Sequence, residues 1–209
     1  GPKVAEFAQR FAEFVRGGSE PSLHAVATTS CTTALHAALL ALGVGAGDEV
    51  VVPAFTYVAT VNAVELAGAR PVFVDVDLDT FNMNIEAAER AVTSRTKAIV
   101  PVSLFGRPSR VMELQDDMFR GRVRPVQIVE DCACALGASV SELHAGTSAT
   151  MAAFSFHPRK VISTGEGGML ITADRELAAR LRSIRDHGAA ASDLERHHGT
   201  APHLMPDHS

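Results

Sequence analysis

The chain has 209 residues, of which 46% are hydrophobic and 21% charged, the composition of a globular protein with a sizeable core. The net charge is −5 and the basic residues are dispersed, which argues against nucleic acid as a partner. The apolar runs break within a few residues, far short of the roughly 20 that cross a bilayer, so we expect no membrane partner either.

The chain opens with an amphipathic pattern at about Val4–Arg16 that predicts a helix rather than a signal peptide. Short β-branched runs then alternate with helical patterns. Strands are expected at Ala25–Thr28, Glu49–Val52, Pro71–Val76, Ala98–Val102, Val126–Val129, Met151–Phe156 and Gly168–Thr172, and helices at Thr32–Leu42, Val58–Ala67, Asn84–Val92, Ser109–Phe119 and Arg175–Arg185. This alternation predicts an α/β fold with a mostly parallel central sheet and helices on both faces. In such sheets ligands bind beyond the carboxyl ends of the strands.

The last stretch, Asp186–Ser209, has no sustained periodicity and carries five histidines among Gly, Ala, Ser and Pro. We interpret it as a surface loop, because a histidine-rich composition alone does not define a metal site. Three cysteines, Cys31, Cys132 and Cys134, cannot form a disulfide framework and fit a reducing cytoplasm. The Cys132-x-Cys134 pair lacks a second ligand pair at zinc spacing, so we expect small core residues and no metal.

Hydroxyl residues follow the first expected strand, at Ser30-Cys31-Thr32-Thr33, and open the next helix. Hydroxyls and free amides at a helix N-terminus suit a dianionic phosphate, although the same residues also serve as an ordinary N-cap. The glycine-rich Gly43–Asp48 follows a helix and precedes a strand, the reverse of the dinucleotide-binding order. We therefore interpret it as a helix end and turn.

Two further segments carry ionisable groups. Val129-Glu130-Asp131 ends an apolar strand, where a buried acid requires a cationic partner such as a protonated pyridine nitrogen; an exposed carboxylate is the simpler alternative. Lys160 is one of only three lysines and lies between a strand and the glycine-rich Thr164–Gly168. An amine there is a candidate for covalent catalysis, while the neighbouring His157 and Arg159 are equally typical of a solvated basic turn.

Together these segments resemble the sugar aminotransferases of the DegT/StrS type, pyridoxal-phosphate (PLP) enzymes with the aspartate-aminotransferase fold. The matching stretches occur in the family's order and at roughly its spacing; they are residues 1–4, 30–42, 47–53, 55–62, 129–131, 135–138, 154–160 and 165–168. The resemblance implies a fold type I large domain over residues 1–185 and a loop at 186–209 leading toward a small C-terminal domain. It also implies that the chain is truncated at both ends.

The resemblance implies a role for individual residues. Lys160 would hold PLP as a Schiff base and then act as general base and acid. Asp131 would pair with the pyridine nitrogen, and Tyr57 would stack on the ring, with Phe55 as the competing candidate and core packing as the alternative for Tyr57. The phosphate would be bound by Thr32, the backbone at Thr33, and Ser155, in agreement with the helix N-terminus described above.

The implied reaction moves an amino group from an amino acid, usually glutamate, to a keto group of a nucleotide-linked sugar, as in amino-sugar biosynthesis. A homodimer with shared active sites is implied as well. Two positions depart from the family pattern: Cys134 stands where Gln or His usually contacts the phenolic oxygen of PLP, and Ser103 where His is frequent. A thiol is a weak donor, so that contact would be altered.

Three alternatives remain from the sequence. A sugar dehydratase of the same family would carry histidine in place of Lys160, so the lysine argues against it. A cyclitol or other small ketone is an alternative acceptor. A non-catalytic or degenerate PLP-binding paralogue is disfavoured because Lys160, Asp131 and the hydroxyls of the phosphate site are all present.

Overall fold

The computed structural model describes residues 1–18, 21–119 and 126–189, and its centre is a seven-stranded sheet. The strands are β1 (His24–Thr28), β2 (Glu49–Pro53), β3 (Arg70–Val74), β4 (Thr96–Ile99), β5 (Gln127–Asp131), β8 (Met151–Ser155) and β9 (Gly168–Thr172), in the order β1-β9-β8-β5-β4-β2-β3. The strand β9 runs antiparallel to both of its neighbours, β1 and β8, and every other pair in this sheet is parallel. The predicted α/β fold with a mostly parallel sheet is therefore confirmed.

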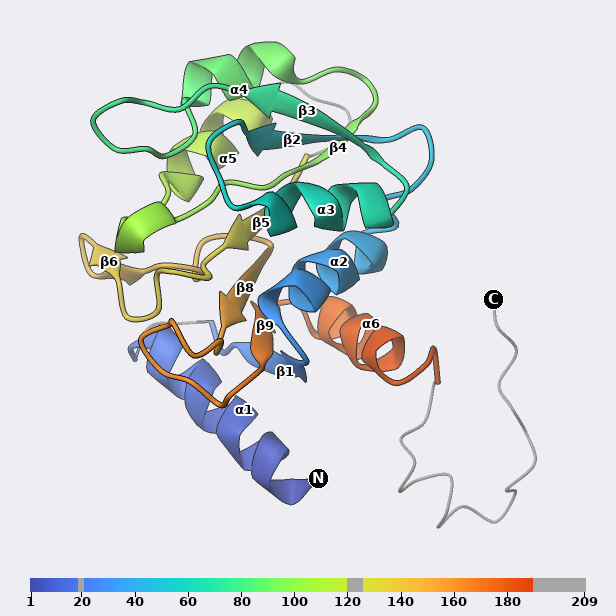
Figure 1. Cartoon of the computed structure of the whole chain (residues 1–209), viewed down its shortest axis with the longest axis vertical. Coiled ribbons are helices and arrows are strands. Elements are labelled where there is room, and N and C mark those ends of the chain that lie inside the picture. Colours follow the sequence, from blue (N-terminus) through green and yellow to red (C-terminus); the bar gives the residue numbers. More distant parts are fainter. Residues whose placement is uncertain (19–20, 120–125, 190–209) are drawn as a thin grey trace.

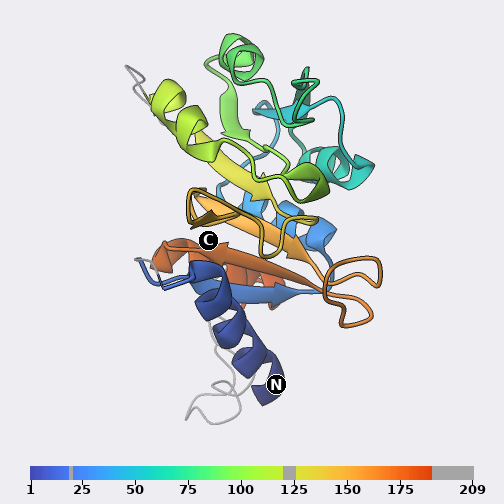
Figure 2. The same ribbon diagram turned by 90° about the vertical axis from the view of Figure 1, so that its left-hand side faces the viewer.

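Helices cover both faces of this sheet (Figures 1 and 2). The helices α2 (Cys31–Ala41), α3 (Val58–Leu66) and α6 (Arg175–Arg185) form a row on one face and share a core cluster with the strands. On the other face, α4 (Ile85–Ala91) and α5 (Val111–Phe119) pack over β2 to β5, while α1 (Pro2–Arg16) packs on β1, β8 and β9. No helix in the described ranges is long and apolar enough to span a bilayer.

Local signals in the sequence explain where the helices begin and end. Ser30 caps α2 through its hydroxyl, which accepts from the Thr33 amide, and Thr33 accepts in turn from the Ser30 amide. Asn84 caps α4 and Asp174 caps α6, each by accepting from amides of the first helical turn with its side chain. At the other end of α1, Gly17 adopts the left-handed conformation that closes the helix.

The strands of the middle of the sheet are buried on both faces, which explains their continuous apolar sequences. In β2, Val50 and Val52 contribute to the core under α2 and α3, while Val51 contributes to the core under α4 and α5. The strand β8 divides in the same way, with Met151 on one side and Phe154 on the other. Alternation of this kind holds the carboxyl ends of β5 and β8 rigidly between two layers of helices.

The structure differs from the sequence prediction at a few boundaries. The predicted strand Ala98–Val102 ends at Ile99, just before Pro101, which cannot donate to a strand ladder. A two-stranded hairpin, β6 (Ser139–Val140) and β7 (Leu143–His144), was not predicted because its strands have two residues each. The turn predicted at Gly43–Asp48 is confirmed, with Gly43 at φ +68°. Most of the predicted loop, residues 190–209, lies outside the described residues.

Glu49 supplies a test of this fold at the amino end of β2. The side chain is buried, and Thr93, Arg70 and Arg95 hydrogen-bond its carboxylate, which lowers its pKa from 4.5 to about 2. We predict that Glu49→Gln lowers the Tm by roughly 3–10 °C at neutral pH. A carboxylate with a depressed pKa stabilises the fold only while it is ionised, so the difference should shrink as the pH falls from about 4.5 toward 2. Thermal unfolding of both proteins across this range measures it, and a difference independent of pH would contradict the prediction.

Candidate active site

Ionisable side chains from distant parts of the chain gather beyond the carboxyl ends of β5 and β8. Asp131 is the last residue of β5 and pairs in register with Ala153 of the neighbouring β8. Five residues after the end of β8, Lys160 lies in a tight turn in which its amide donates to the His157 carbonyl. This is the edge of the sheet at which a parallel α/β fold binds its ligands.

Asp131 is buried, which decides between the two interpretations of this acid. Its Oδ2 accepts from the Thr60 hydroxyl at 2.8 Å and its Oδ1 from the Ala133 amide at 3.0 Å, while the Cys31 thiol lies 3.9 Å from Oδ1. Burial raises the pKa of Asp131, and the Ala133 amide, the Thr60 hydroxyl and the charge of Lys160 oppose that rise. An exposed carboxylate is therefore excluded, and the site favours a cation beside Asp131.

Lys160 and Cys134, two residues to which the resemblance gives a role, are direct neighbours. The Lys160 Nζ lies 3.1 Å from the Cys134 Sγ, and both side chains are partly buried. Within the described ranges Lys160 forms no ion pair. Its amine therefore donates to a weakly polar partner, and the charge of Asp131 acts on it without a direct ion pair.

The N-terminus of α2 lies beside the end of β8 because of a glycine between them. Thr28 and Ser155 both pair with Gly168, so they stand two strand spacings apart, about 10 Å. A Cβ on Gly168 would lie 2.4 Å from the Ser30 carbonyl, so only glycine permits this approach. The Thr33 amide donates a hydrogen bond to the Ser30 hydroxyl. Within the described residues the amides of Cys31 and Thr32 have no hydrogen-bond partner. Free amides at a helix N-terminus beside a serine hydroxyl form an anion site.

Tyr57 and Phe55 follow β2 at the same edge of the sheet. Tyr57 is the N-cap residue of α3 and is 69% exposed, which excludes core packing as its role. Phe55 is 49% exposed and contacts Phe81 with ring centroids 5.6 Å apart. Tyr57 is therefore free to meet a ligand, whereas Phe55 belongs to a separate group of rings.

Two contacts of this site were missed from the sequence. Thr60 and Cys31, which both reach Asp131, lie 71 and 100 residues away from it in the chain. A buried threonine in the first turn of a helix that follows a strand was the only local signal for Thr60. Glu130, next to Asp131, points elsewhere, because its carboxylate accepts from Ser103 and from the Gly146 amide. Burial raises the pKa of Glu130 against these bonds.

The exposure of the three cysteines gives a direct test of this geometry. Cys31 and Cys132 are buried and burial raises the pKa of both thiols, whereas Cys134 is partly exposed beside Lys160. Because thiolates react and thiols do not, we predict that iodoacetamide alkylates Cys134 at least about tenfold faster than the other two. Peptide mass spectrometry of a time course measures this, with Cys134→Ser as the control. Alkylation of Cys31 or Cys132 before Cys134 would contradict this placement of the three thiols.

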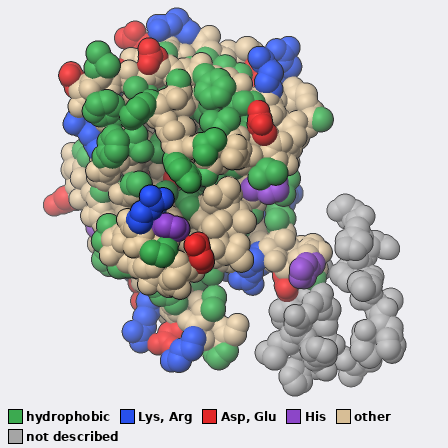
Figure 3. Space-filling model, viewed as in Figure 1, with side chains coloured by type: hydrophobic (Ala, Val, Ile, Leu, Met, Phe, Trp, Pro, Cys, Tyr) green, Lys and Arg blue, Asp and Glu red, His purple; other side chains and the backbone are tan. Residues whose placement is uncertain are grey.

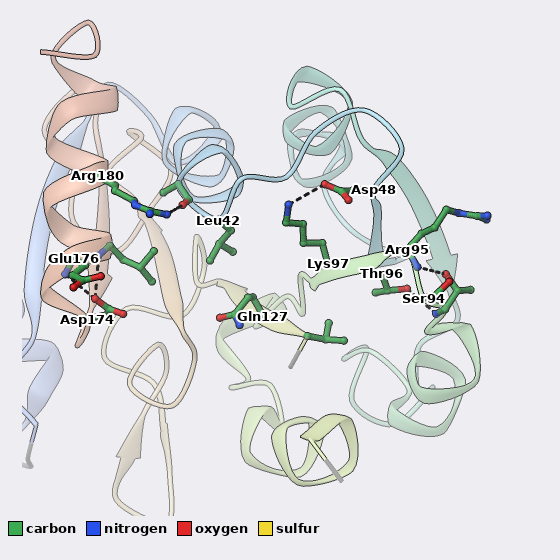
Figure 4. Close-up of a pocket in the computed structure, with 14 residues that line it drawn as sticks. Leu42, Asp48, Ser94, Arg95, Thr96, Lys97, Gln127, Asp174, Glu176 and Arg180 are labelled. Carbon is green, nitrogen blue, oxygen red and sulfur yellow. Dashed lines mark hydrogen bonds and ion pairs between the residues drawn. The ribbon is translucent and has the colours of Figure 1, made fainter. Parts of the chain in front are cut away.

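A cavity of about 810 Å³ lies at the amino edge of the sheet, opposite the edge that carries Lys160, and Figure 4 shows the residues that line it. Its three basic groups already have partners within the protein. Lys97 pairs with Asp48, Arg95 with Glu49, and Arg180 donates to the Ala41 carbonyl. Because these basic groups are already engaged by the protein, this cavity is a weaker candidate than the carboxyl edge despite its size.

Residues 1–202 match the family model described as the DegT/DnrJ/EryC1/StrS aminotransferase family. The chain is 42% identical over 188 residues to a GDP-perosamine synthase of Caulobacter vibrioides, covering 90% of this chain and 48% of that protein. It is 45% identical over 167 residues to a UDP-N-acetyl-3-dehydro-α-D-glucosamine 3-aminotransferase of Acidithiobacillus ferrooxidans, covering 79% and 44%. The chain thus spans about half the length of the curated relatives it matches.

Solved structures that resemble this chain come from the same class of enzyme as these relatives. The crystal structure of Streptomyces venezuelae DesV in complex with a ketimine intermediate has a TM-score of 0.84 and 39% identity, with 92% of this chain and 50% of that chain covered. A candidate sugar aminotransferase of Streptococcus pneumoniae in its PLP form has a TM-score of 0.80 and 32% identity, with 92% and 53% covered. At these identities the likeness supports more than a shared fold.

Proposed function

The chain belongs to the DegT/DnrJ/EryC1/StrS aminotransferase family of PLP-dependent enzymes, and from this membership we propose that it binds PLP and transfers an amino group to a keto group of a nucleotide-linked sugar. The observation that carries the proposal is the convergence of buried Asp131 and the unpaired Lys160 amine at one edge of the sheet. Glutamate is the proposed amino donor. A homodimer that shares its active sites is a further part of the proposal.

The chemistry of the residues at this edge fits PLP. Buried Asp131 forms no ion pair with the described residues, and a pyridine ring nitrogen that holds a proton would supply one. The free amides and hydroxyl at the start of α2, together with Ser155, suit the dianionic phosphate. The Lys160 amine, which has no ion-pair partner among the described residues, suits the aldehyde of PLP.

When bound, PLP supplies an electron sink that stabilises negative charge on the substrate carbon. We assign the remaining work to the chain. Asp131 keeps the ring nitrogen protonated, and Thr60 and the Ala133 amide hold that carboxylate in place. Lys160 would hold the cofactor covalently through Nζ and, once the substrate amine has displaced it, would take a proton from the substrate carbon as general base and return it, as general acid, to the cofactor carbon bonded to the same nitrogen. Tyr57 covers the ring, and Thr32, Thr33 and Ser155 hold the phosphate. Cys134, beside Nζ, replaces a stronger hydrogen-bond donor.

Thr60 is expected to act through Asp131, as a positioning residue. We predict that Thr60→Val, which keeps the shape of the side chain, weakens PLP binding roughly tenfold because it removes a hydrogen bond to a buried carboxylate. Thr60→Ser keeps the hydroxyl and should restore most of the affinity. Titration with PLP followed by absorbance measures both variants. Equal losses in the two variants would assign Thr60 to packing rather than to Asp131.

The reaction itself is tested in two half-reactions with the PLP-loaded protein. Glutamate should bleach the visible absorbance of the bound cofactor and release one equivalent of 2-oxoglutarate. A nucleotide-linked ketosugar should then restore the absorbance and leave as the amino sugar. Bleaching without restoration by any nucleotide-linked ketosugar, but with restoration by a cyclitol ketone, would change the acceptor. No bleaching by any amino acid would favour a non-catalytic PLP-binding protein.

A further inference from the structure

Three phenylalanine rings form an exposed cluster at the carboxyl edge, which we call the aromatic platform: Phe55, Phe81 and Phe105. The ring centroids of Phe55 and Phe81 are 5.6 Å apart, and those of Phe81 and Phe105 are 5.9 Å apart. The rings are 49%, 41% and 71% exposed. They belong to the segments that follow β2, β3 and β4, and Figure 3 shows apolar side chains gathered over this region.

The backbone of the platform is strained. Phe81 and Phe105 have φ values of +57° and +55°, a left-handed conformation that bulky residues rarely adopt. Strain of this kind persists only where surrounding contacts impose it, and it concentrates at functional sites. Phe81 and Phe105 keep this backbone conformation although their rings are left in solvent. We therefore interpret the exposure of the rings as having a role beyond the fold.

A buried asparagine ties the two strained segments together. Asn82 is 4% exposed, and its Nδ2 donates to the carbonyls of Pro108 at 2.9 Å and Arg107 at 3.4 Å. The segment that carries Phe81 is thereby fixed to the segment that carries Phe105. The platform is therefore preorganised, which lowers the entropy cost of binding a ligand.

The platform adjoins the proposed site of chemistry. Gly106 follows Phe105 directly, and a Cβ on it would lie 3.5 Å from the Cys134 carbonyl oxygen. Cys134 is the residue whose thiol contacts the Lys160 amine. The platform is therefore within reach of the remaining parts of a substrate whose sugar meets Lys160.

We propose that the aromatic platform binds the base of a nucleoside diphosphate by stacking, with Phe105 as the principal ring; this inference rests on the nucleotide-linked substrate proposed above. The uncharged base suits this surface better than the phosphates do, because Asp75, Asp77 and Asp79 lie just before Phe81 in the chain. The exposed Arg107 offers a cation for the diphosphate close to Phe105. Stacking uses the π-face common to all bases, so it favours nucleotides without selecting one base.

Calorimetric titration of the PLP-loaded protein with UDP, GDP and pyrophosphate tests the platform. Phe105→Leu keeps an apolar side chain without a π-face and should weaken binding of both nucleotides roughly 5- to 150-fold, the range expected for one lost stack. Phe105→Tyr should retain the affinity, and pyrophosphate should bind wild type and Phe105→Leu equally. Phe14→Leu, which makes the same change at a ring on α1 that is 57% exposed, serves as the matched control and should change none of these affinities.

Several results would overturn the platform: no binding of UDP or GDP by the wild type, equal affinity in Phe105→Leu, or an equal loss for pyrophosphate. If Phe105→Leu instead changed the sedimentation of the protein and left nucleotide affinity intact, the rings would belong to a contact between two copies of the chain. The amino-transfer proposal fails separately. If glutamate does not bleach the wild-type cofactor while nucleotide binding still depends on the ring at position 105, the platform stands without that function.

Discussion

Replacing Lys160 by alanine is expected to slow amino transfer by at least about 10⁴-fold, because the same amine attaches PLP and moves the proton. The visible absorbance band of the lysine-bound cofactor should disappear as well. PLP itself should still bind. Asp131 and the N-terminus of α2 are unchanged in this variant, so non-covalent binding should remain measurable by equilibrium dialysis. Single-turnover rates with glutamate, read by stopped-flow absorbance, give the magnitude.

Lys97→Ala is the matched control for this prediction. Lys97 is also partly buried, but it lies at the amino edge of the sheet, where it pairs with Asp48 (Figure 4). Its replacement should leave the absorbance band and the rate unchanged. A band that survives in Lys160→Ala and vanishes in Lys97→Ala would relocate the site to the other edge of the sheet.

Asp131→Asn is expected to reduce the rate of amino transfer by roughly 10²–10³-fold, the cost of removing a preorganised charge from an active site. The neutral amide no longer holds a proton on the ring nitrogen. The surrounding hydrogen bonds can still form, because the Ala133 amide meets the remaining oxygen and the Thr60 hydroxyl can turn toward Thr56, 3.1 Å away. Rates with glutamate and a ketosugar measure the loss.

The stability of Asp131→Asn without cofactor separates charge from structure. Burial raises the pKa of Asp131, and a carboxyl with a raised pKa contributes stability that is lost as the pH rises through its folded pKa. The amide does not ionise, so the variant should have a Tm at pH 8 equal to or above that of the wild type. Saturating PLP should reverse this order, since the wild type alone gains the ion pair. Glu130→Gln, at the adjacent buried acid, is the control and should not change the rate by more than a few fold.

Much of the fold was predictable because the strands are buried on both faces. A short continuous apolar run, such as the one that becomes β8, is typical of a strand buried on both faces. The capping residues Ser30 and Asp174 indicate locally where α2 and α6 begin. The hairpin of β6 and β7 has strands too short to show a period. Boundaries near Pro101 shifted because proline cannot donate to a strand ladder.

The site was predictable only in part. Asp131 and Lys160 carry local signals, an acid at the end of an apolar strand and a rare lysine before a glycine-rich turn, and the family resemblance joins them. Thr60 carries no such signal, because its role depends on a partner 71 residues away. The aromatic platform depends on the left-handed backbone at Phe81 and Phe105, which no sequence pattern indicates for phenylalanine.

The central claim, that Lys160 is the residue that attaches PLP, is tested most directly by reduction and peptide mapping. Borohydride fixes the cofactor permanently to the amine that carries it, and digestion followed by mass spectrometry identifies that amine. The chain has only Lys3, Lys97 and Lys160 to choose from. We predict one pyridoxyl group per chain, on Lys160 alone. A label on Lys3 or Lys97, or a PLP-treated protein that carries no label after reduction, would contradict the account.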